Sequence, residues 1–109
     1  ERKRLLVRVA VAQARYNARR HPYDSCINNN LGFILMWATL TTGEDYRTEA
    51  WASFRRAVEL EPNLLAAWSN IAKLSDSMGD RRRTISILEK ILKIKPDDIE
   101  AKELMEKLR

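Results

Sequence analysis

Residues 63–96 read NLLAAWSNIAKLSDSMGDRRRTISILEKILKIKP, a stretch that closes on a proline, Pro96. Another proline, Pro62, stands immediately before this stretch, and the segment in front of Pro62 has a similar pattern of small and bulky residues. Gly79 and Asp80 divide the stretch, because glycine favours the conformation that ends helices and aspartate favours the position that starts them. The pattern predicts two helices joined by a tight turn, in a unit that repeats.

This repeated unit resembles the tetratricopeptide repeat (TPR), a helix–turn–helix whose period equals the spacing between Pro62 and Pro96. Small residues at fixed places let the two helices of such a repeat approach closely, and bulky ones fill the space around them. The resemblance covers residues 22–96. The residues that carry it are Trp68, Ile71, Ala72, Gly79, Thr84, Leu88 and Ile91 in one repeat, and Leu31, Gly32, Ala50, Phe54 and Ala57 in the other.

The resemblance implies an all-α, right-handed solenoid of about six antiparallel helices. Residues 22–62 and 63–96 would each form one repeat, residues 1–21 the second helix of a truncated repeat, and residues 97–109 a capping helix. The prolines that bound the earlier repeat, Pro22 and Pro62, are more widely spaced than Pro62 and Pro96. The difference is six positions, so we expect six extra residues around the internal turn of that repeat, near residues 38–45. Shared between two helices, they would make this hairpin project beyond its neighbour.

Each end of the chain predicts one further helix. Asp97 followed by Glu100 has the spacing of a capping box, which would start the last helix at Asp97. That helix has one apolar face and is otherwise charged, as a terminal helix of a solenoid requires. Its apolar residues are Ile99, Ala101, Leu104, Met105 and Leu108, and those of the first helix, residues 2–20, are Leu5, Leu6, Val9, Ala10, Ala12 and Tyr16.

Composition limits the kind of protein. The chain has 109 residues, of which 45% are hydrophobic and 32% charged, and a net charge of +5. This balance is typical of a folded helical protein, and no apolar run is long enough to span a bilayer. A single cysteine allows no internal disulfide and is compatible with a reducing compartment, so we expect a soluble, intracellular protein. Because the chain opens on Glu1 without an initiator Met, we interpret it as a piece of a longer protein.

The resemblance also implies a binding site, since the first helix of each TPR lines a concave groove. We expect a protein or peptide partner there, held by apolar anchors and by amide side chains that pair with the ligand backbone. Two interpretations of Phe33, Met36 and Trp37 stay open: they bind the partner, or they pack against the long hairpin or an absent helix. The candidate residues are Asn29, Asn30, Phe33, Met36, Trp37, Ser69, Asn70 and Lys73.

One TPR activity is disfavoured by the residues present. TPRs that bind chaperone tails clamp a terminal carboxylate with lysine, asparagine and arginine side chains on three successive first helices. Asn70 matches this pattern, but Asn29 and Phe33 replace the expected Lys and Asn. On the last helix Glu100 and Leu104 stand where Lys and Arg are needed, and an acid there would repel a carboxylate. We therefore expect no carboxylate clamp.

Other functions receive weaker support. The first helix and the run Arg81–Arg83 are basic enough to contact phosphates, but no aromatic platform or known nucleic-acid module accompanies them. His21 is the only histidine, Cys26 has no identifiable base, and no phosphate loop or metal-ligand spacing occurs. We predict a non-enzymatic interaction or scaffold module without cofactor or metal. The alternative is self-assembly into a homo-oligomer, or docking, through the first helix and the long hairpin.

Overall fold

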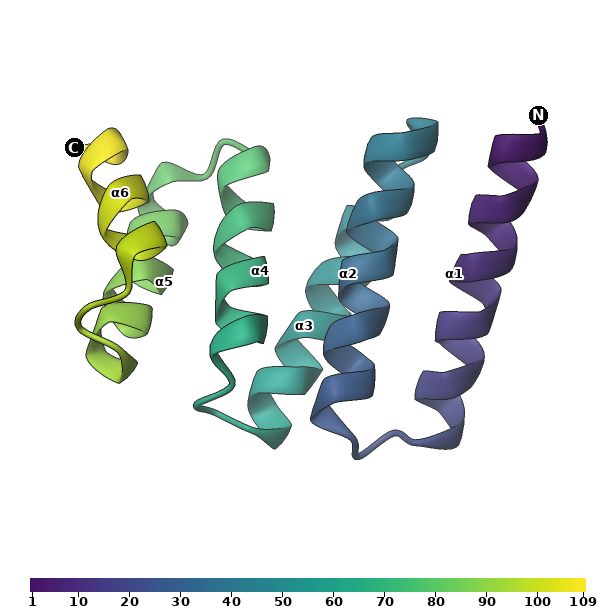
Figure 1. Cartoon of the computed structure of the whole chain (residues 1–109), viewed down its shortest axis with the longest axis horizontal. Coiled ribbons are helices and arrows are strands. Elements are labelled where there is room, and N and C mark those ends of the chain that lie inside the picture. The colour runs from purple at the N-terminus through teal and green to yellow at the C-terminus, as the bar shows by residue number, and fades with distance from the viewer. The chain divides into compact units, whose positions relative to one another are not determined.

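The structure is a computed structural model that describes all residues, Glu1–Arg109, and it contains six α-helices and no β-strand (Figure 1). The predicted all-α helical-repeat fold is therefore confirmed. The chain divides into two compact units, Glu1–Pro62 with the first three helices and Asn63–Arg109 with the other three. The helices are α1 (Arg2–Arg20), α2 (Ser25–Thr42), α3 (Arg47–Leu60), α4 (Leu65–Ser77), α5 (Arg81–Ile94) and α6 (Ile99–Leu108). None of them is long and apolar enough to cross a membrane.

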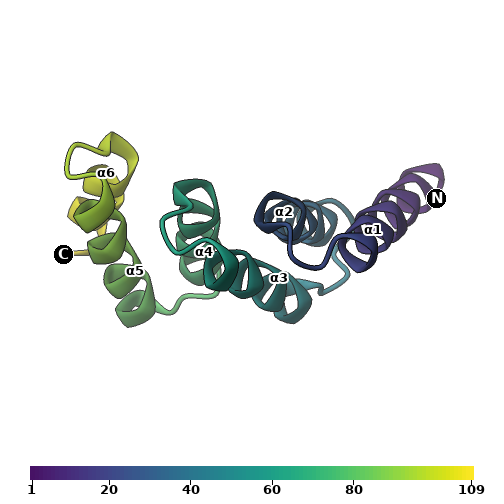
Figure 2. The ribbon, with the colours of Figure 1, turned by 90° about the horizontal axis from the view of Figure 1, so that it is seen from below.

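In the first unit α2 packs against both α1 and α3 (Figures 1 and 2). The contact with α3 is close because Gly32 has no side chain: a Cβ built there would lie 2.5 Å from the ring of Phe54. Phe54 itself is fully buried, together with Leu35 of α2. On α1, a valine pair and an alanine complete the core: Val7, Val11 and Ala14.

In the second unit α5 packs against both α4 and α6. Gly79 adopts the left-handed conformation with φ of +75°, which ends α4, and the Asp80 carboxylate accepts a hydrogen bond from the Arg83 amide at 3.1 Å, which starts α5. Both caps agree with the sequence prediction. The core contains Leu74 and Leu88, and a polar pair in which the Thr84 hydroxyl donates to the Ser75 hydroxyl at 2.9 Å.

The extra residues of the first hairpin are distributed differently from the prediction. Helix α2 has 18 residues and α4 has 13, whereas α3 and α5 have 14 each. Five of the six extra residues therefore extend α2, and only one lengthens the turn, which Gly43 begins with φ of +80°. The added length corresponds to about 7 Å of helix. It is matched by α1, which has 19 residues, and not by α3.

The two terminal helices also differ in detail. The buried face of α1 is Val7, Val11 and Ala14, whereas the positions read from the sequence, such as Leu5 and Val9, are about 60% exposed. A helix with apolar residues on opposite sides gives no single face by periodicity, so the sequence alone did not identify the buried one.

At the other end, Asp98 and not Asp97 caps α6, because its carboxylate accepts from the Ala101 amide at 2.9 Å. The predicted capping box with Glu100 is therefore absent. Ala101 and Met105 are buried as expected, but Ile99 is 71% exposed and does not belong to the apolar face.

Candidate functional site

Helix α2 is unusual in this basic chain because none of its 18 residues is charged. Its start is fixed by Asp24, whose carboxylate accepts from the Ile27 amide at 3.0 Å. One side of the helix is buried through Leu31, Leu35 and Ala38. The opposite side is left with neutral side chains only, so any ligand on it would meet no fixed charge from α2.

This opposite side of α2 carries an apolar stripe, which we call the α2 face: Phe33, Met36, Trp37 and Leu40. The spacing of three and four residues places these side chains on one side of the helix. Phe33 is 52% exposed, Trp37 40% and Leu40 82%, whereas Met36 is partly buried. Phe33 and Trp37 therefore lie outside the core of the first unit. Leu40 was not among the residues predicted from the sequence, although its spacing from Phe33 could have indicated it.

The three consecutive asparagines at the start of α2 have different environments. Asn28 is buried and its amide donates to the Pro22 carbonyl at 3.3 Å and to the Asp24 carbonyl at 2.9 Å, which holds the chain between α1 and α2. Asn29 is partly buried and Asn30 is exposed on the outer side. Asn28 was not among the residues predicted from the sequence, although its spacing from Leu31 and Leu35 places it on the buried side of α2.

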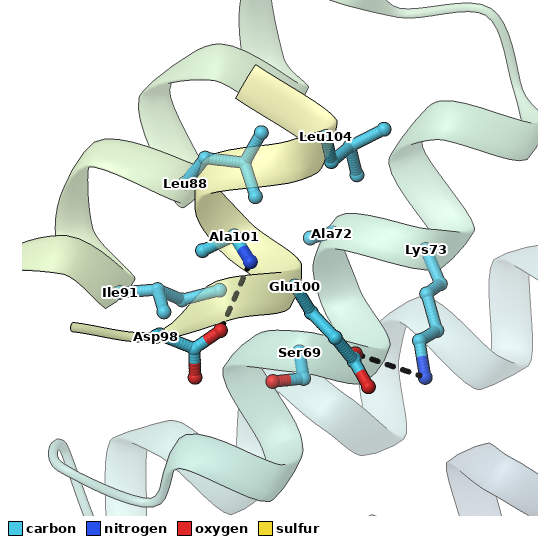
Figure 3. A pocket seen from close by; sticks show the side chains of 9 residues that line it. All are labelled: Ser69, Ala72, Lys73, Leu88, Ile91, Asp98, Glu100, Ala101 and Leu104. Carbon is cyan, nitrogen blue, oxygen red and sulfur yellow. Dashed lines mark hydrogen bonds and ion pairs between the residues drawn. The ribbon is translucent and has the colours of Figure 1, made fainter. Parts of the chain in front are cut away.

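The remaining predicted residues lie on α4, in the second unit. Lys73 is exposed and its ammonium is 4.0 Å from the Glu100 carboxylate of α6, while Ser69 and Asn70 are partly exposed (Figure 3). Ser69 and Lys73 border a hollow of about 50 Å³ between α4, α5 and α6. This space holds a few water molecules at most, so it is no pocket for a large side chain. Its other lining residues are Ala72, Leu88, Ile91, Asp98, Glu100, Ala101 and Leu104.

The structure thus brings the predicted residues together in two groups. Asn29, Asn30, Phe33, Met36 and Trp37 share α2, and Ser69, Asn70 and Lys73 share α4. That the two helices line one groove stays a prediction.

Charged groups with shifted pKa values gather beyond the C-terminal end of the α2 face. The pKa of Glu44 is lowered because its carboxylate accepts from the Tyr46 hydroxyl at 2.8 Å and from Arg8 at 3.3 Å. The same hydrogen bond raises the pKa of Tyr46. A second ion pair, Arg15 with Glu49, raises the pKa of that arginine. These contacts attach α1 to the α2–α3 turn and to α3.

Reactive side chains are not assembled into a centre. Cys26 is exposed at the start of α2, and no group of three or more His, Cys, Asp or Glu residues is placed to hold a metal ion. The α2 group consists of apolar and amide side chains, and the α4 group of a hydroxyl, an amide and an ammonium group.

Comparison with known proteins identifies the fold. No family model matches the chain, and no curated protein matches it in sequence. Among solved structures, the chain is similar to the first TPR of Spaghetti (RPAP3) bound to the HSP90 peptide SRMEEVD. The TM-score is 0.76, the sequence identity is 14%, and the match covers 98% of this chain and 90% of that chain. The chain therefore has the helical-repeat fold of a TPR domain.

Proposed function

We propose that this chain is a protein-interaction module that binds an apolar peptide segment or helix on the α2 face. The observation that carries the proposal is the exposure of Phe33 and Trp37 on one side of a helix without charges. Exposed aromatic residues in a contiguous patch favour a binding role, because they are the commonest anchors of protein interfaces.

This face can contribute a substantial part of the free energy that a complex requires. A buried aromatic side chain removes roughly 150–250 Å² from water, and burial contributes roughly 25 cal/mol per Å². Because Phe33 and Trp37 are about half exposed, covering both would contribute roughly 3–5 kcal/mol before the cost of association. Leu40 would add a third anchor one turn further along.

Polar groups beside the apolar anchors would set the register of the ligand. Asn30 is exposed and Asn29 partly exposed at the N-terminal end of the α2 face. Each side-chain amide offers a donor and an acceptor to a peptide backbone. We propose the same role for Ser69 and Asn70 on α4, with Lys73 as a flanking cation.

The proposed ligand differs from that of the structurally similar Spaghetti domain, which is bound to a peptide ending in Val-Asp. In this chain the Glu100 carboxylate forms an ion pair with the Lys73 ammonium at 4.0 Å. A carboxylate added there would be repelled by Glu100. We therefore propose recognition of an internal, apolar segment in place of a free carboxyl terminus.

The test is a selection of displayed peptides against the whole chain. We expect the enriched peptides to carry two or more apolar anchors spaced by three or four positions. By fluorescence anisotropy the double substitution should weaken their binding at least about tenfold. Amidation of their carboxyl terminus should leave the affinity unchanged.

A matched control is Leu5→Ala/Val9→Ala, which removes two exposed apolar side chains from α1. This variant should bind the selected peptides as the unchanged chain does. Circular dichroism should show the same helix content for both variants, because the substituted residues are exposed. Unchanged peptide binding by folded Phe33→Ala/Trp37→Ala would refute the proposal.

A further inference from the structure

A second apolar surface lies on α1, on the side that faces away from α2. Leu5, Val9, Ala12 and Tyr16 are spaced by four, three and four residues, and all four are exposed. Leu6 borders them and is 61% exposed. We call these five residues the α1 stripe. It is independent of the α2 face and belongs to a different helix.

The α1 stripe is surrounded by positive charge. Arg2 stands one turn before Leu5, and Arg19 and Arg20 follow Tyr16, while α1 contains no acidic residue at all. Glu44 and Glu49 pair with Arg4, Arg8 and Arg15 on the side toward α2 and α3. Arg2, Lys3, Arg19 and Arg20 form no ion pair with an acid. Arg20 instead contacts Tyr16, donating to its hydroxyl at 3.0 Å.

The outer surface of α6 differs from that of α1. On α6 the residues Ala101 and Met105 are buried, and charged side chains cover most of the outer surface. On α1 apolar side chains occupy the outer surface. The apolar contact that a partner could make is therefore larger on α1.

We propose that the α1 stripe docks an amphipathic helix of a partner protein that presents acidic residues on both sides of its apolar seam. The stripe from Leu5 to Tyr16 is about 16 Å long and one side chain wide, which fits one helix lying along it. The acidic flanks of the partner would pair with Arg2, Arg19 and Arg20 and replace the water around them.

Two other occupants fit less well. A second copy of this chain would bring the four unpaired basic residues of one α1 close to the same four of another: Arg2, Lys3, Arg19 and Arg20. The acidic helix α6 of a second copy cannot dock either, because its apolar residues Ala101 and Met105 are already buried. An anionic membrane would match the charge, but of the side chains that anchor helices at a membrane surface the α1 stripe has only two leucines and no Trp or Phe.

The experiment uses the full chain and a synthetic three-heptad peptide with Leu at positions a and d and Glu at e and g. The repulsion between glutamates keeps this peptide from pairing with itself. The control peptide has Lys at e and g. By anisotropy at moderate salt, the glutamate peptide should bind at least about tenfold more tightly than the lysine peptide.

Variants of the chain separate the α1 stripe from the α2 face. Leu5→Gln/Val9→Gln should weaken binding of the glutamate peptide about tenfold or more, since two apolar contacts are lost without a change of charge. Arg2→Gln/Arg20→Gln should weaken it and flatten its dependence on salt. The matched control Phe33→Gln/Leu40→Gln, which alters the α2 face equally, should leave it unchanged.

Four results would overturn this proposal. The first is that the two peptides bind equally, and the second is that the α2-face variant loses binding while the α1 variant keeps it. The third is that sedimentation shows the chain alone forming dimers that Leu5→Gln/Val9→Gln abolishes, which would make a second copy the occupant. The fourth is that phosphatidylserine vesicles bind the chain through Leu5 and Val9 while the glutamate peptide does not bind. The two sets of variants keep this test distinct from that of the α2 face.

Discussion

At the scale of single residues, Gly32 is the position where the first unit tolerates least. Its missing side chain admits the ring of Phe54, which would lie 2.5–2.8 Å from an added Cβ. Alanine favours a helix by about 1 kcal/mol over glycine. Overpacking a rigid, fully buried ring costs about 1–3 kcal/mol. Because Phe54 is fully buried and cannot turn into solvent, we expect Gly32→Ala to lower the free energy of unfolding by up to about 2 kcal/mol.

A double-mutant cycle checks this cause. Phe54→Leu removes the ring, so Gly32→Ala should lower the free energy of unfolding less in that background than in the unchanged chain. The higher helix propensity of alanine should then offset more of the remaining cost. Urea denaturation followed by circular dichroism measures all four variants. Equal costs of Gly32→Ala in both backgrounds would show that the ring contact does not limit this position. Gly79 is no substitute as a control, since its positive φ adds a separate strain.

At the scale of helices, we expect the attachment of α1 to the α2–α3 turn to weaken at acidic pH. The pKa of Glu44 lies below its ordinary value of 4.5, through the hydrogen bond from Tyr46 and the contact with Arg8. A carboxyl group whose pKa is lowered by folding stabilises the fold above its unfolded pKa and loses that effect as pH falls through the folded value. We expect the chain to lose stability below about pH 4.5, and Glu44→Gln to remove part of that dependence.

The measurement is the urea midpoint of both chains at neutral and at acidic pH. At neutral pH the urea midpoint of the unchanged chain should be higher than that of Glu44→Gln. The difference between the two midpoints should shrink as pH falls through the lowered pKa of Glu44. Asp97→Asn is the matched control, because Asp97 is exposed and forms no ion pair. A difference that stays constant with pH would exclude Glu44 as the responsible group.

The helices themselves could be predicted well from the sequence, and their surroundings less well. The turn at Gly79 and Asp80 was predicted correctly, because each residue type has one strong local preference. The buried face of α1 was not, because Leu5 and Val9 lie opposite Val7 and Val11, and periodicity cannot rank two apolar faces. Only the contact with α2 decides which face is inward.

Two further details depended on packing in the same way. Adjacent aspartates at positions 97 and 98 both suit a helix start, and the structure uses the second. The six extra residues of the first hairpin could lengthen either helix or the turn. Five of them extend α2, whose length of 18 residues is close to the 19 of α1. For the candidate site, the sequence indicated Phe33 and Trp37 but left open whether they are exposed or buried. Only the fold shows that both side chains are exposed.

At the scale of the whole molecule, the net charge and the proposed binding surface are separated. The chain has a net charge of +5, yet the α2 face carries no charge and the α4 group pairs its one cation, Lys73, with Glu100. An acidic peptide would therefore be attracted by the molecule as a whole without a fixed site for its carboxyl terminus. Such attraction is weak and falls with salt.

This separation predicts how the chain treats SRMEEVD, the peptide of the similar Spaghetti structure. The free-acid peptide and its C-terminal amide should bind equally weakly at physiological salt, because Glu100 and Leu104 offer no cation where a terminal carboxylate would lie. Any weak binding should disappear as salt is raised, for both forms alike. Isothermal titration calorimetry with the two peptides decides the point. Preference for the free acid by about tenfold or more, lost in Asn70→Ala, would instead reveal a carboxylate site and contradict the ligand proposed for the α2 face.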